Sequence, residues 1–372
     1  MKENRTDQIK RKKKNRLILF VGIAIFLGLY TIFWIVYTNV HFSAEQVYQE
    51  VNIENKRKTE VAMEATEPIS IALLGIDTGI YANNDGPARS DAIIIATVNP
   101  TTKTTTLVSI PRDTYTLMDG YEDEVGYAYY DKLTHAFAFG GAEMSLNSIQ
   151  ELLSIPIDYY VEVDMKGLID IVDAIGGITI TSPLTFDYEG NYFKKGQKYK
   201  LNGVEALAFS RMRKTDPEGD FGRQKREKMT IEAMIDQILT LKSISRYKSV
   251  LKSLENNVKT NLSFNDMMNI YNGYSASLET FNQDSLAISE MYIEEIYYAY
   301  SSPEERVRVS NRIREELELE SIDVNDLLLM DIDWTYDDGY LYENITNEED
   351  TWEPEENYET EINEYEQEVW DE

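Results

Sequence analysis

The chain contains no cysteine, only two histidines and far fewer basic than acidic residues, and each shortage excludes a class of function. Without cysteine there is neither a disulfide framework nor thiolate chemistry. Two histidines, His41 and His135, are too few for a histidine-rich zinc site. The 36 Lys and Arg face 66 Asp and Glu, and the net charge of −30 argues against nucleic acid as a partner. The 372 residues, 42% of them hydrophobic, still suffice for a sizeable core.

Basic residues are concentrated at the N-terminus, where the sequence predicts a membrane anchor. Residues 1–16 are strongly basic, and residues 17–38 carry no charge. At about 1.5 Å per residue, a helix over 17–38 can cross a hydrocarbon core of about 30 Å. The basic flank predicts a cytoplasmic N-terminus and an extracellular domain. We therefore expect a single-pass protein of the cell membrane with a retained signal anchor, and a cleaved signal peptide is the alternative.

The rest of the chain divides by composition into three parts. Residues 39–67 are polar and free of Gly and Pro, which predicts a helical stalk. Residues 68–330 have the composition of a globular domain. Residues 331–372 hold 18 acidic residues and no Lys or Arg, so we expect a disordered acidic tail. The tail carries spaced tryptophans, and it is either a solvated, repulsive segment or an arm for a protein partner.

Three apolar runs at the start of the domain predict neighbouring β-strands. They cover residues 69–77, 91–98 and 104–110, with turn residues at 99–103 and Pro111 blocking further pairing. If the strands pair antiparallel, their charged ends converge on one edge of the sheet. The converging residues are Asp77, Arg89, Asp91, Arg112 and Asp113. Three carboxylates and two guanidinium groups in one place need a bridging group, which a metal ion and a phosphate would supply.

Further strands and helices alternate along the domain. This predicts an α/β fold in which a mixed central β-sheet is sandwiched between helical layers, an α-β-α arrangement, beside the N-terminal transmembrane helix. Residues 120–130 form an acidic, tyrosine-rich stretch that we expect to be a loop. The remaining expected elements are helices at 134–139, 142–153, 165–174 and 220–241 and strands at 159–164 and 178–181.

A second group of arginines stands out in the acidic domain. Arg211 and Arg213 precede the helix at 220–241, and Arg223 and Arg226 are three residues apart on it. Guanidinium groups bind phosphate oxygens bidentately and stay charged. Asp220 is placed to cap this helix, whose N-terminus favours an anion. The alternative is pairing with surface carboxylates, worth at most about 1 kcal/mol per pair.

Asp77 and Asp91 are hard oxygen ligands of the kind that Mg²⁺ takes together with substrate phosphate oxygens. The alternative interpretation is that they are ordinary turn residues at strand ends.

The motifs resemble, in order and spacing, those of the LytR-CpsA-Psr family, over roughly residues 69–242. The matching segments are 75–77, 88–91, 109–113, 135–141, 173–177, 211–213 and 220–223. The resemblance implies a membrane-anchored phosphotransferase of a Gram-positive cell envelope. Such enzymes move teichoic acid or capsular polysaccharide from an undecaprenyl pyrophosphate carrier to peptidoglycan.

The resemblance also implies roles for individual residues. Asp77 and Asp91 look like Mg²⁺ ligands, and Asp220 matches a further functional aspartate. The expected pyrophosphate-binding residues are Arg89, Arg112, Arg211, Arg213 and Arg223, joined by position 227. The family usually has Gln where this chain has Glu227, which adds negative charge beside the phosphates. Among these residues Arg89, Asp91, Arg112, Asp113 and Asp220 are the expected catalytic set.

Two other functions fit the same residues. One is hydrolysis of the polyprenyl pyrophosphate carrier, with water as acceptor. The other is a non-catalytic protein that binds polyprenyl phosphates and regulates envelope assembly. The lipid needs an apolar groove, for which the helices at 142–153 and 165–174 supply candidate walls, although core packing also explains their apolar residues.

Overall fold

A computed structural model describes most of the globular part of the chain. The described residues are 46–54, 56–57, 67–79, 87–123, 125–240, 257–278 and 280–328. Within them, no helix has the length and apolar character needed to cross a membrane. The predicted basic tail, the predicted span at 17–38 and the predicted acidic tail at 331–372 lie outside the described residues.

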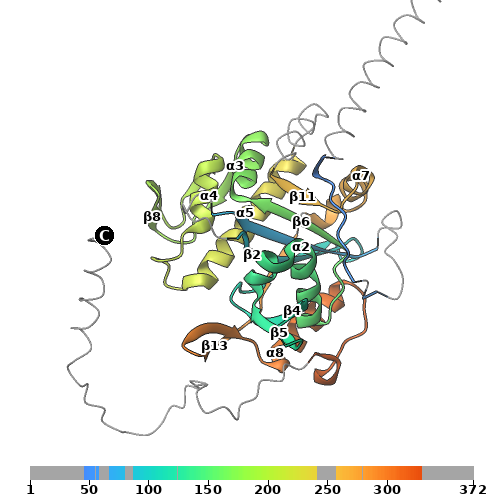
Figure 1. The fold of residues 1–372 in the computed structure, drawn as a ribbon. Coiled ribbons are helices and arrows are strands. Elements are labelled where there is room, and N and C mark those ends of the chain that lie inside the picture. The colour runs from blue at the N-terminus through green and yellow to red at the C-terminus, as the bar shows by residue number, and fades with distance from the viewer. Residues whose placement is uncertain are drawn as a thin grey trace, which may run out of the picture. The chain divides into compact units, whose positions relative to one another are not determined.

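The centre of the fold is a six-stranded sheet in the order β11-β6-β1-β2-β3-β12 (Figure 1). β1 is parallel to β6 and β3 is parallel to β12, whereas the other neighbours pair antiparallel, so the sheet is mixed as predicted. The strands are β1 (Ile69–Asp77), β2 (Arg89–Asn99), β3 (Thr104–Ser109), β6 (Tyr159–Asp164), β11 (Val258–Thr260) and β12 (Phe281–Ser285).

The predicted turn between the second and third runs closes a β2–β3 hairpin. Asn99 lies opposite Thr104, and its side-chain oxygen accepts hydrogen bonds from the backbone N–H groups of Thr101 and Thr102. This Asx-type turn explains why the strands end where the β-branched runs end. The hairpin and the antiparallel β1–β2 pair bring the end of β1, the start of β2 and the end of β3 to one edge of the sheet.

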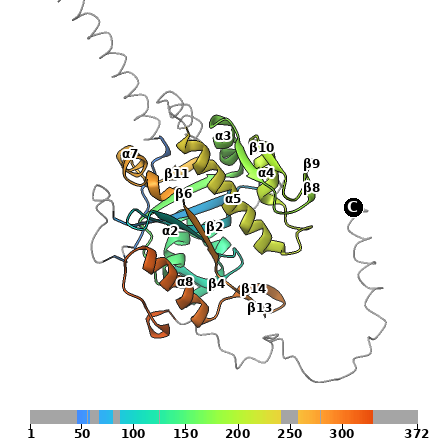
Figure 2. The same ribbon diagram turned by 180° about the vertical axis from the view of Figure 1, so that it is seen from behind.

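Helices cover both faces of the sheet. Alternate residues of β1, β2 and β3 pack against α2 (Leu133–Leu153) and α8 (Pro303–Glu316) in the largest core. The intervening residues meet α5 (Gly219–Leu239) on the other face, where α7 (Phe264–Gly273) also lies. Figure 1 shows α2 in front of the sheet. In Figure 2, which is seen from behind, α5 crosses the opposite face of the sheet.

A second core lies beside the sheet and is centred on three phenylalanines, Phe186, Phe193 and Phe209. It joins α5 to a group of short elements (Figure 1). These are α3 (Met165–Ala174), β7 (Ile178–Thr181), β8 (Phe186–Tyr188), β9 (Asn191–Phe193), β10 (Lys198–Leu201) and α4 (Gly203–Arg211). The remaining elements are the hairpin of β13 (Ser289–Ile293) and β14 (Ile296–Tyr300) and two short 3₁₀ helices, η2 (Ser275–Leu278) and η3 (Val324–Asp326).

The prediction of a helical stalk at 39–67 is wrong for the part of this segment that the structure describes. Of residues 46–54 and 56–57, only 46–47 are helical. Val47 is buried, and Val51 and Ile53 pack against the largest core. The segment is extended because its apolar side chains bind to the domain.

The tyrosine-rich stretch at 120–130, expected to be a loop, is mostly a hairpin. β4 (Tyr115–Glu122) pairs antiparallel with β5 (Ala128–Lys132), and Asp123 accepts hydrogen bonds from the backbone N–H groups of Val125 and Tyr127 in the turn. Tyrosines favour strands, which outweighs the acidic, glycine-containing turn signal.

Candidate functional site

The end of β1 and the start of β2 bring carboxylates and an arginine together. Asp77 lies opposite Arg89 in the strand register, and the register shifts after Gly75 so that Asp91 has no partner on β1. Such a bulge turns a side chain away from its regular direction. Arg89 is exposed, and it forms no ion pair with any residue that the structure describes.

Arg112 reaches this edge from the segment after β3. Its Nη1 lies 2.9 Å from a carboxylate oxygen of Asp91, and its Nε lies 3.6 Å from Asp113. Lys132, at the end of β5, lies 3.4 Å from the other oxygen of Asp113. Sequence reasoning missed Lys132, because the strand that positions it was interpreted as a loop.

Arg223 connects the second group of arginines to this edge. Its Nη1 donates to the backbone carbonyl of Asp91 at 3.0 Å and to Glu227 at 3.0 Å. Its Nε donates to Asp220 at 2.9 Å. The structure therefore brings Arg223 and Asp220 of α5 next to the Asp91–Arg112 pair, and we call these four residues, with Asp77, Arg89 and Asp113, the edge cluster.

Asp220 does not cap α5, contrary to the prediction. The N-cap is Glu218, which makes no side-chain cap bond, and Asp220 lies within the first turn. Burial alone would raise the pKa of Asp220, but Arg223, the Gln224 side chain and Arg112 lower it. Asp220 is thus a carboxylate that holds Arg223 in place.

Glu227 is mostly buried, with 13% of its side chain exposed. Burial raises its pKa to about 7; Arg223 and, less strongly, Arg226 oppose this rise, whereas Asp220 and Asp91 add to it. Arg223 therefore shares its charge between two carboxylates, one of which is easily protonated.

The other predicted arginines lie in different surroundings. Arg226 does not share its surroundings with Arg223, because it is fully buried and donates to Asp216 and to the carbonyls of Phe209 and Met212. These hydrogen bonds hold α5 against the second core. Arg211 pairs with Glu189 at 3.5 Å. Arg213 is exposed, and within the described residues neither Arg211 nor Arg213 forms an ion pair with the edge cluster.

Unpaired buried polar atoms concentrate around the edge cluster. Seven buried side-chain atoms lack a hydrogen-bond partner among the described residues, and five of them are close to it in sequence or contact. These are Ser90 Oγ, Ser109 Oγ, Arg112 Nε, Thr134 Oγ1 and Gln224 Oε1. Thr134 donates its backbone N–H to the Arg112 carbonyl, and Gln224 donates to Asp220. Since native proteins leave few such atoms unpaired, this concentration indicates a place for a polar ligand.

The carboxylates at this edge suit a metal that needs few protein ligands. No group of three or more His, Cys, Asp or Glu placed to hold a metal occurs within the described residues. Mg²⁺ is usually held by one or two carboxylates together with phosphate oxygens and waters. Asp77 and the bulged Asp91, on adjacent strands, fit that requirement.

The helices proposed as groove walls are core elements. Leu146, Ile149, Leu152 and Leu153 of α2 are buried in the largest core, whereas Val172 of α3 is buried in the second. Their burial in two cores is the core packing expected as the alternative to a groove.

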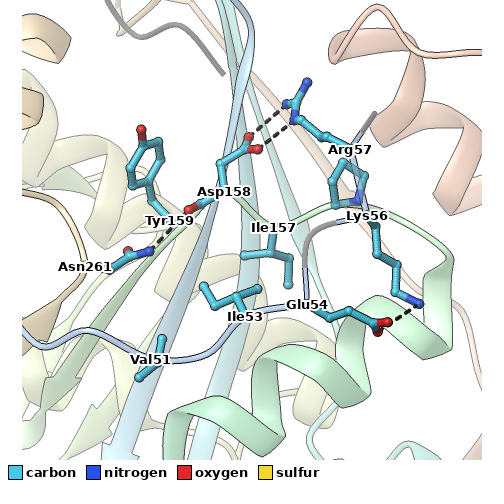
Figure 3. A pocket seen from close by; sticks show the side chains of 10 residues that line it. Val51, Ile53, Glu54, Lys56, Arg57, Ile157, Asp158, Tyr159 and Asn261 are labelled. Atoms are coloured by element: carbon cyan, nitrogen blue, oxygen red, sulfur yellow. Dashed lines mark hydrogen bonds and ion pairs between the residues drawn. The ribbon is translucent and has the colours of Figure 1, made fainter. Parts of the chain in front are cut away.

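A different cluster of charged residues lies at the opposite end of β1. A cavity of about 320 Å³ there is lined by Val51, Ile53, Glu54, Lys56, Arg57, Pro156, Ile157, Asp158, Tyr159 and Asn261. Asp158 faces Arg57 across it (Figure 3) and accepts hydrogen bonds from Arg57 Nε at 2.6 Å and Nη2 at 2.8 Å. Asp158 also accepts from the backbone N–H and hydroxyl of Ser70.

Comparison with known proteins gives these features a context. The model of the LytR_cpsA_psr family matches residues 36–315. The chain belongs to the LytR-CpsA-Psr family. A relative from Bacillus licheniformis, the polyisoprenyl-teichoic acid–peptidoglycan teichoic acid transferase TagU, is 37% identical over 317 residues, which are 84% of this chain and 99% of the relative.

Solved structures of the LytR-CpsA-Psr family share the fold. The crystal structure of Bacillus subtilis TagU is 36% identical, has a TM-score of 0.54, and the match covers 69% of this chain and 99% of that one. A structure of TagT bound to LIIa-WTA is 30% identical, has a TM-score of 0.60, and the match covers 71% of this chain and 96% of that one. The α/β fold with a mixed central sheet is therefore that of the family.

Proposed function

We propose that this chain is a teichoic acid transferase, which moves the polymer from a polyprenyl pyrophosphate carrier to peptidoglycan. The names of its TagU relatives and the match over nearly their whole length support this activity. The observation that carries it is the edge cluster, where arginines contact carboxylates and five buried polar atoms without a hydrogen-bond partner among the described residues lie close in sequence or contact. A pyrophosphate together with a divalent cation would bridge these arginines and carboxylates.

Arg89, Arg112 and Arg223 bind the phosphate oxygens in this proposal. Arg112 and Arg223 are already positioned by Asp91, Asp113, Asp220 and Glu227, so little reorganisation is needed when charge develops. Arg211 and Arg213 lie on or just after α4, and they bind the anionic polymer or the distal phosphate when the carrier is present. Asp77 and Asp91 would hold Mg²⁺, which supplies further charge neutralisation at the phosphates.

The reaction is an exchange of one phosphorus–oxygen bond for another. An acceptor sugar hydroxyl forms a bond to the phosphorus that carries the polymer, and the bond from that phosphorus to the bridging pyrophosphate oxygen breaks. Polyprenyl phosphate leaves with the electron pair of the broken bond. Asp113 takes the hydroxyl proton, since its carboxylate lies in the edge cluster and is not assigned to the metal, and Arg112 and Lys132 hold it in position.

The proposal includes a place in the cell. The residues at 17–38 anchor the chain in the cell membrane with the N-terminus in the cytoplasm, and the family domain faces the wall, where carrier and peptidoglycan meet.

Reconstitution tests the proposal. The full-length protein is incubated with a defined lipid-linked teichoic acid and purified peptidoglycan, with and without Mg²⁺, and the linkage is identified by mass spectrometry. Arg89→Ala should lower the transfer rate about 10²- to 10³-fold, the size typical of removing one charge-stabilising donor. The melting temperature should not change, because Arg89 is exposed.

The matched control is Lys225→Ala, which removes an exposed cation of α5 paired with Glu218 and should leave transfer unchanged. Transfer by Arg89→Ala at the wild-type rate contradicts the assigned pyrophosphate site. Release of polymer phosphate into solution, with none on peptidoglycan, contradicts the transferase activity and identifies a hydrolase.

A further inference from the structure

An exposed group of aromatic rings lies on the β4–β5 hairpin and the first half of α2. Tyr121 stacks on Phe139 with ring centroids 5.0 Å apart, and Tyr129 packs edge-on against both. Tyr121 and Phe139 are each 42% exposed, and Tyr127 in the hairpin turn is 72% exposed. We call these four residues the aromatic platform. Side chains of this size are seldom left at the surface together without a partner.

The charge around the platform limits what it can bind. Residues 115–131 contain no Lys or Arg and carry Asp119, Glu122, Asp123, Glu124 and Asp131. An anionic lipid surface attracts basic segments, and this one is acidic. An anionic polymer such as teichoic acid is repelled for the same reason. An uncharged partner with apolar faces and hydroxyl groups fits, since rings offer flat apolar contact and carboxylates accept hydrogen bonds.

The hairpin connects the platform to the edge cluster. β5 carries Tyr129 of the platform and ends at Lys132, which contacts Asp113. At about 3.3 Å per residue, the two positions are about 10 Å apart along the strand. α2 begins at the next residue, and Thr134 N donates to the carbonyl of Arg112. Asp113, which we assign as base, lies just before β4, so the platform and the base are carried by the same hairpin and the residues next to it.

We infer that the aromatic platform binds an uncharged sugar chain, namely the glycan strand that supplies the acceptor hydroxyl. This inference rests on the proposed function, since it names the surface used by the second substrate. The charged donor is held by the edge cluster, and the acceptor approaches over the acidic aromatic surface. Because the edge cluster carries arginines and the platform is aromatic and acidic, the anionic donor binds at the edge cluster and the uncharged acceptor at the platform.

The test uses the full-length protein and a Tyr121→Ala/Phe139→Ala variant. Binding of short N-acetylglucosamine oligomers, which are uncharged, is measured by calorimetry, and transfer is measured at varied acceptor and at varied donor. We expect the oligomer affinity to fall and the acceptor KM to rise, each about tenfold or more, while the donor KM stays unchanged. Tyr271→Ala, which removes an exposed tyrosine on α7, is the control and should leave both unchanged.

A Tyr121→Leu/Phe139→Leu variant retains apolar bulk and separates loss of ring stacking from loss of folding. If it melts like the wild type and still loses oligomer binding, the platform acts through its rings. If both variants keep the oligomer affinity and the acceptor KM of the wild type, the inference is overturned. The proposed function still stands in that case if the wild-type protein transfers polymer. A selective rise in donor KM, or loss of binding to phosphatidylglycerol vesicles, also overturns the inference. Oligomer binding decides the question even if the wild type transfers no polymer, a result that would contradict the proposed function alone.

Discussion

The two ends of strand β1 both gather arginine and aspartate, and they differ in how completely these groups are paired. At the start of the strand, Asp158 accepts two hydrogen bonds from Arg57 and two from Ser70. At the other end, about 23 Å away along seven residues, the buried Nε of Arg112 makes no hydrogen bond within the described residues, and Arg89 is exposed.

The difference separates charge that holds a fold from charge that awaits a ligand. A buried pair with all its hydrogen bonds made contributes to the native state, and removing one partner leaves an uncompensated charge. A cluster in which buried donors make no hydrogen bond lacks this contribution to the stability of the native state. Such a cluster is typical of sites that bind a charged group. The same residue types can therefore be assigned opposite roles from their hydrogen bonds alone.

The largest effect is expected from Arg112→Ala. Arg112 contacts Asp91 and Asp113 and lies beside the buried unpaired atoms of the cluster. Its removal should lower the transfer rate about 10²- to 10³-fold in the reconstituted assay. Because its side chain is 27% exposed and that of its partner Asp91 is 25% exposed, the free energy of unfolding should fall by about 1 kcal/mol or less. A large loss of stability with normal transfer by the folded fraction would give this end of β1 the structural role.

Asp158→Ala should give the reverse result. The Arg57–Asp158 pair is mostly buried, with 11% and 9% of the side chains exposed, so we expect the free energy of unfolding to fall by about 3 kcal/mol. Transfer per folded molecule should not change. Denaturant unfolding and the transfer assay on the same preparation measure both quantities.

The Arg57→Ala/Asp158→Ala double variant is the control for this pair. It removes both charges, so it should be less destabilised than the sum of the two single variants. Strict additivity, or a selective loss of transfer by Asp158→Ala, would show that the two ends of β1 do not differ in the way described.

Much of the fold could be predicted because local signals and tertiary structure agree. The β-branched runs and the Asn99 turn predicted the β2–β3 hairpin, and the glycine pair after 174 predicted the end of α3. Segment 120–130 and residues 48–54 were misassigned because their structure depends on partners. β5 is a strand through its pairing with β4, and Val51 and Ile53 are fixed by a core built from later residues.

The candidate site was predictable where it depends on strand ends and not where it depends on side-chain direction. Asp91 and Arg112 follow from the antiparallel order, and a spacing of three residues on α5 correctly suggests nearby positions for Arg223 and Arg226. Spacing alone does not show that Arg226 enters the second core. The bulge at Asp91 and the approach of Lys132 come from pairing that no single segment encodes.

The last predicted effect concerns Glu227, which pairs with Arg223 of the edge cluster and whose pKa is raised by burial from 4.5 to about 7. Between these values the folded state holds a proton that the unfolded state has lost, so the free energy of unfolding falls as pH rises through this window. Glu227→Gln cannot lose that proton and keeps an oxygen for Arg223. It should therefore be more stable than the wild type by roughly 3 kcal/mol above about pH 7.5, with the gain vanishing near pH 4.5.

Denaturant unfolding across this pH range, without Mg²⁺ or carrier, measures the Glu227 effect. Glu218→Gln, on the same helix but with an exposed side chain, is the matched control and should show no such pH-dependent gain. A constant difference between Glu227→Gln and the wild type at every pH would mean that folding does not raise the pKa of Glu227. In that case Glu227 would not help to identify the ligand site. Arg89, Arg112 and the buried polar atoms without hydrogen bonds would still mark it.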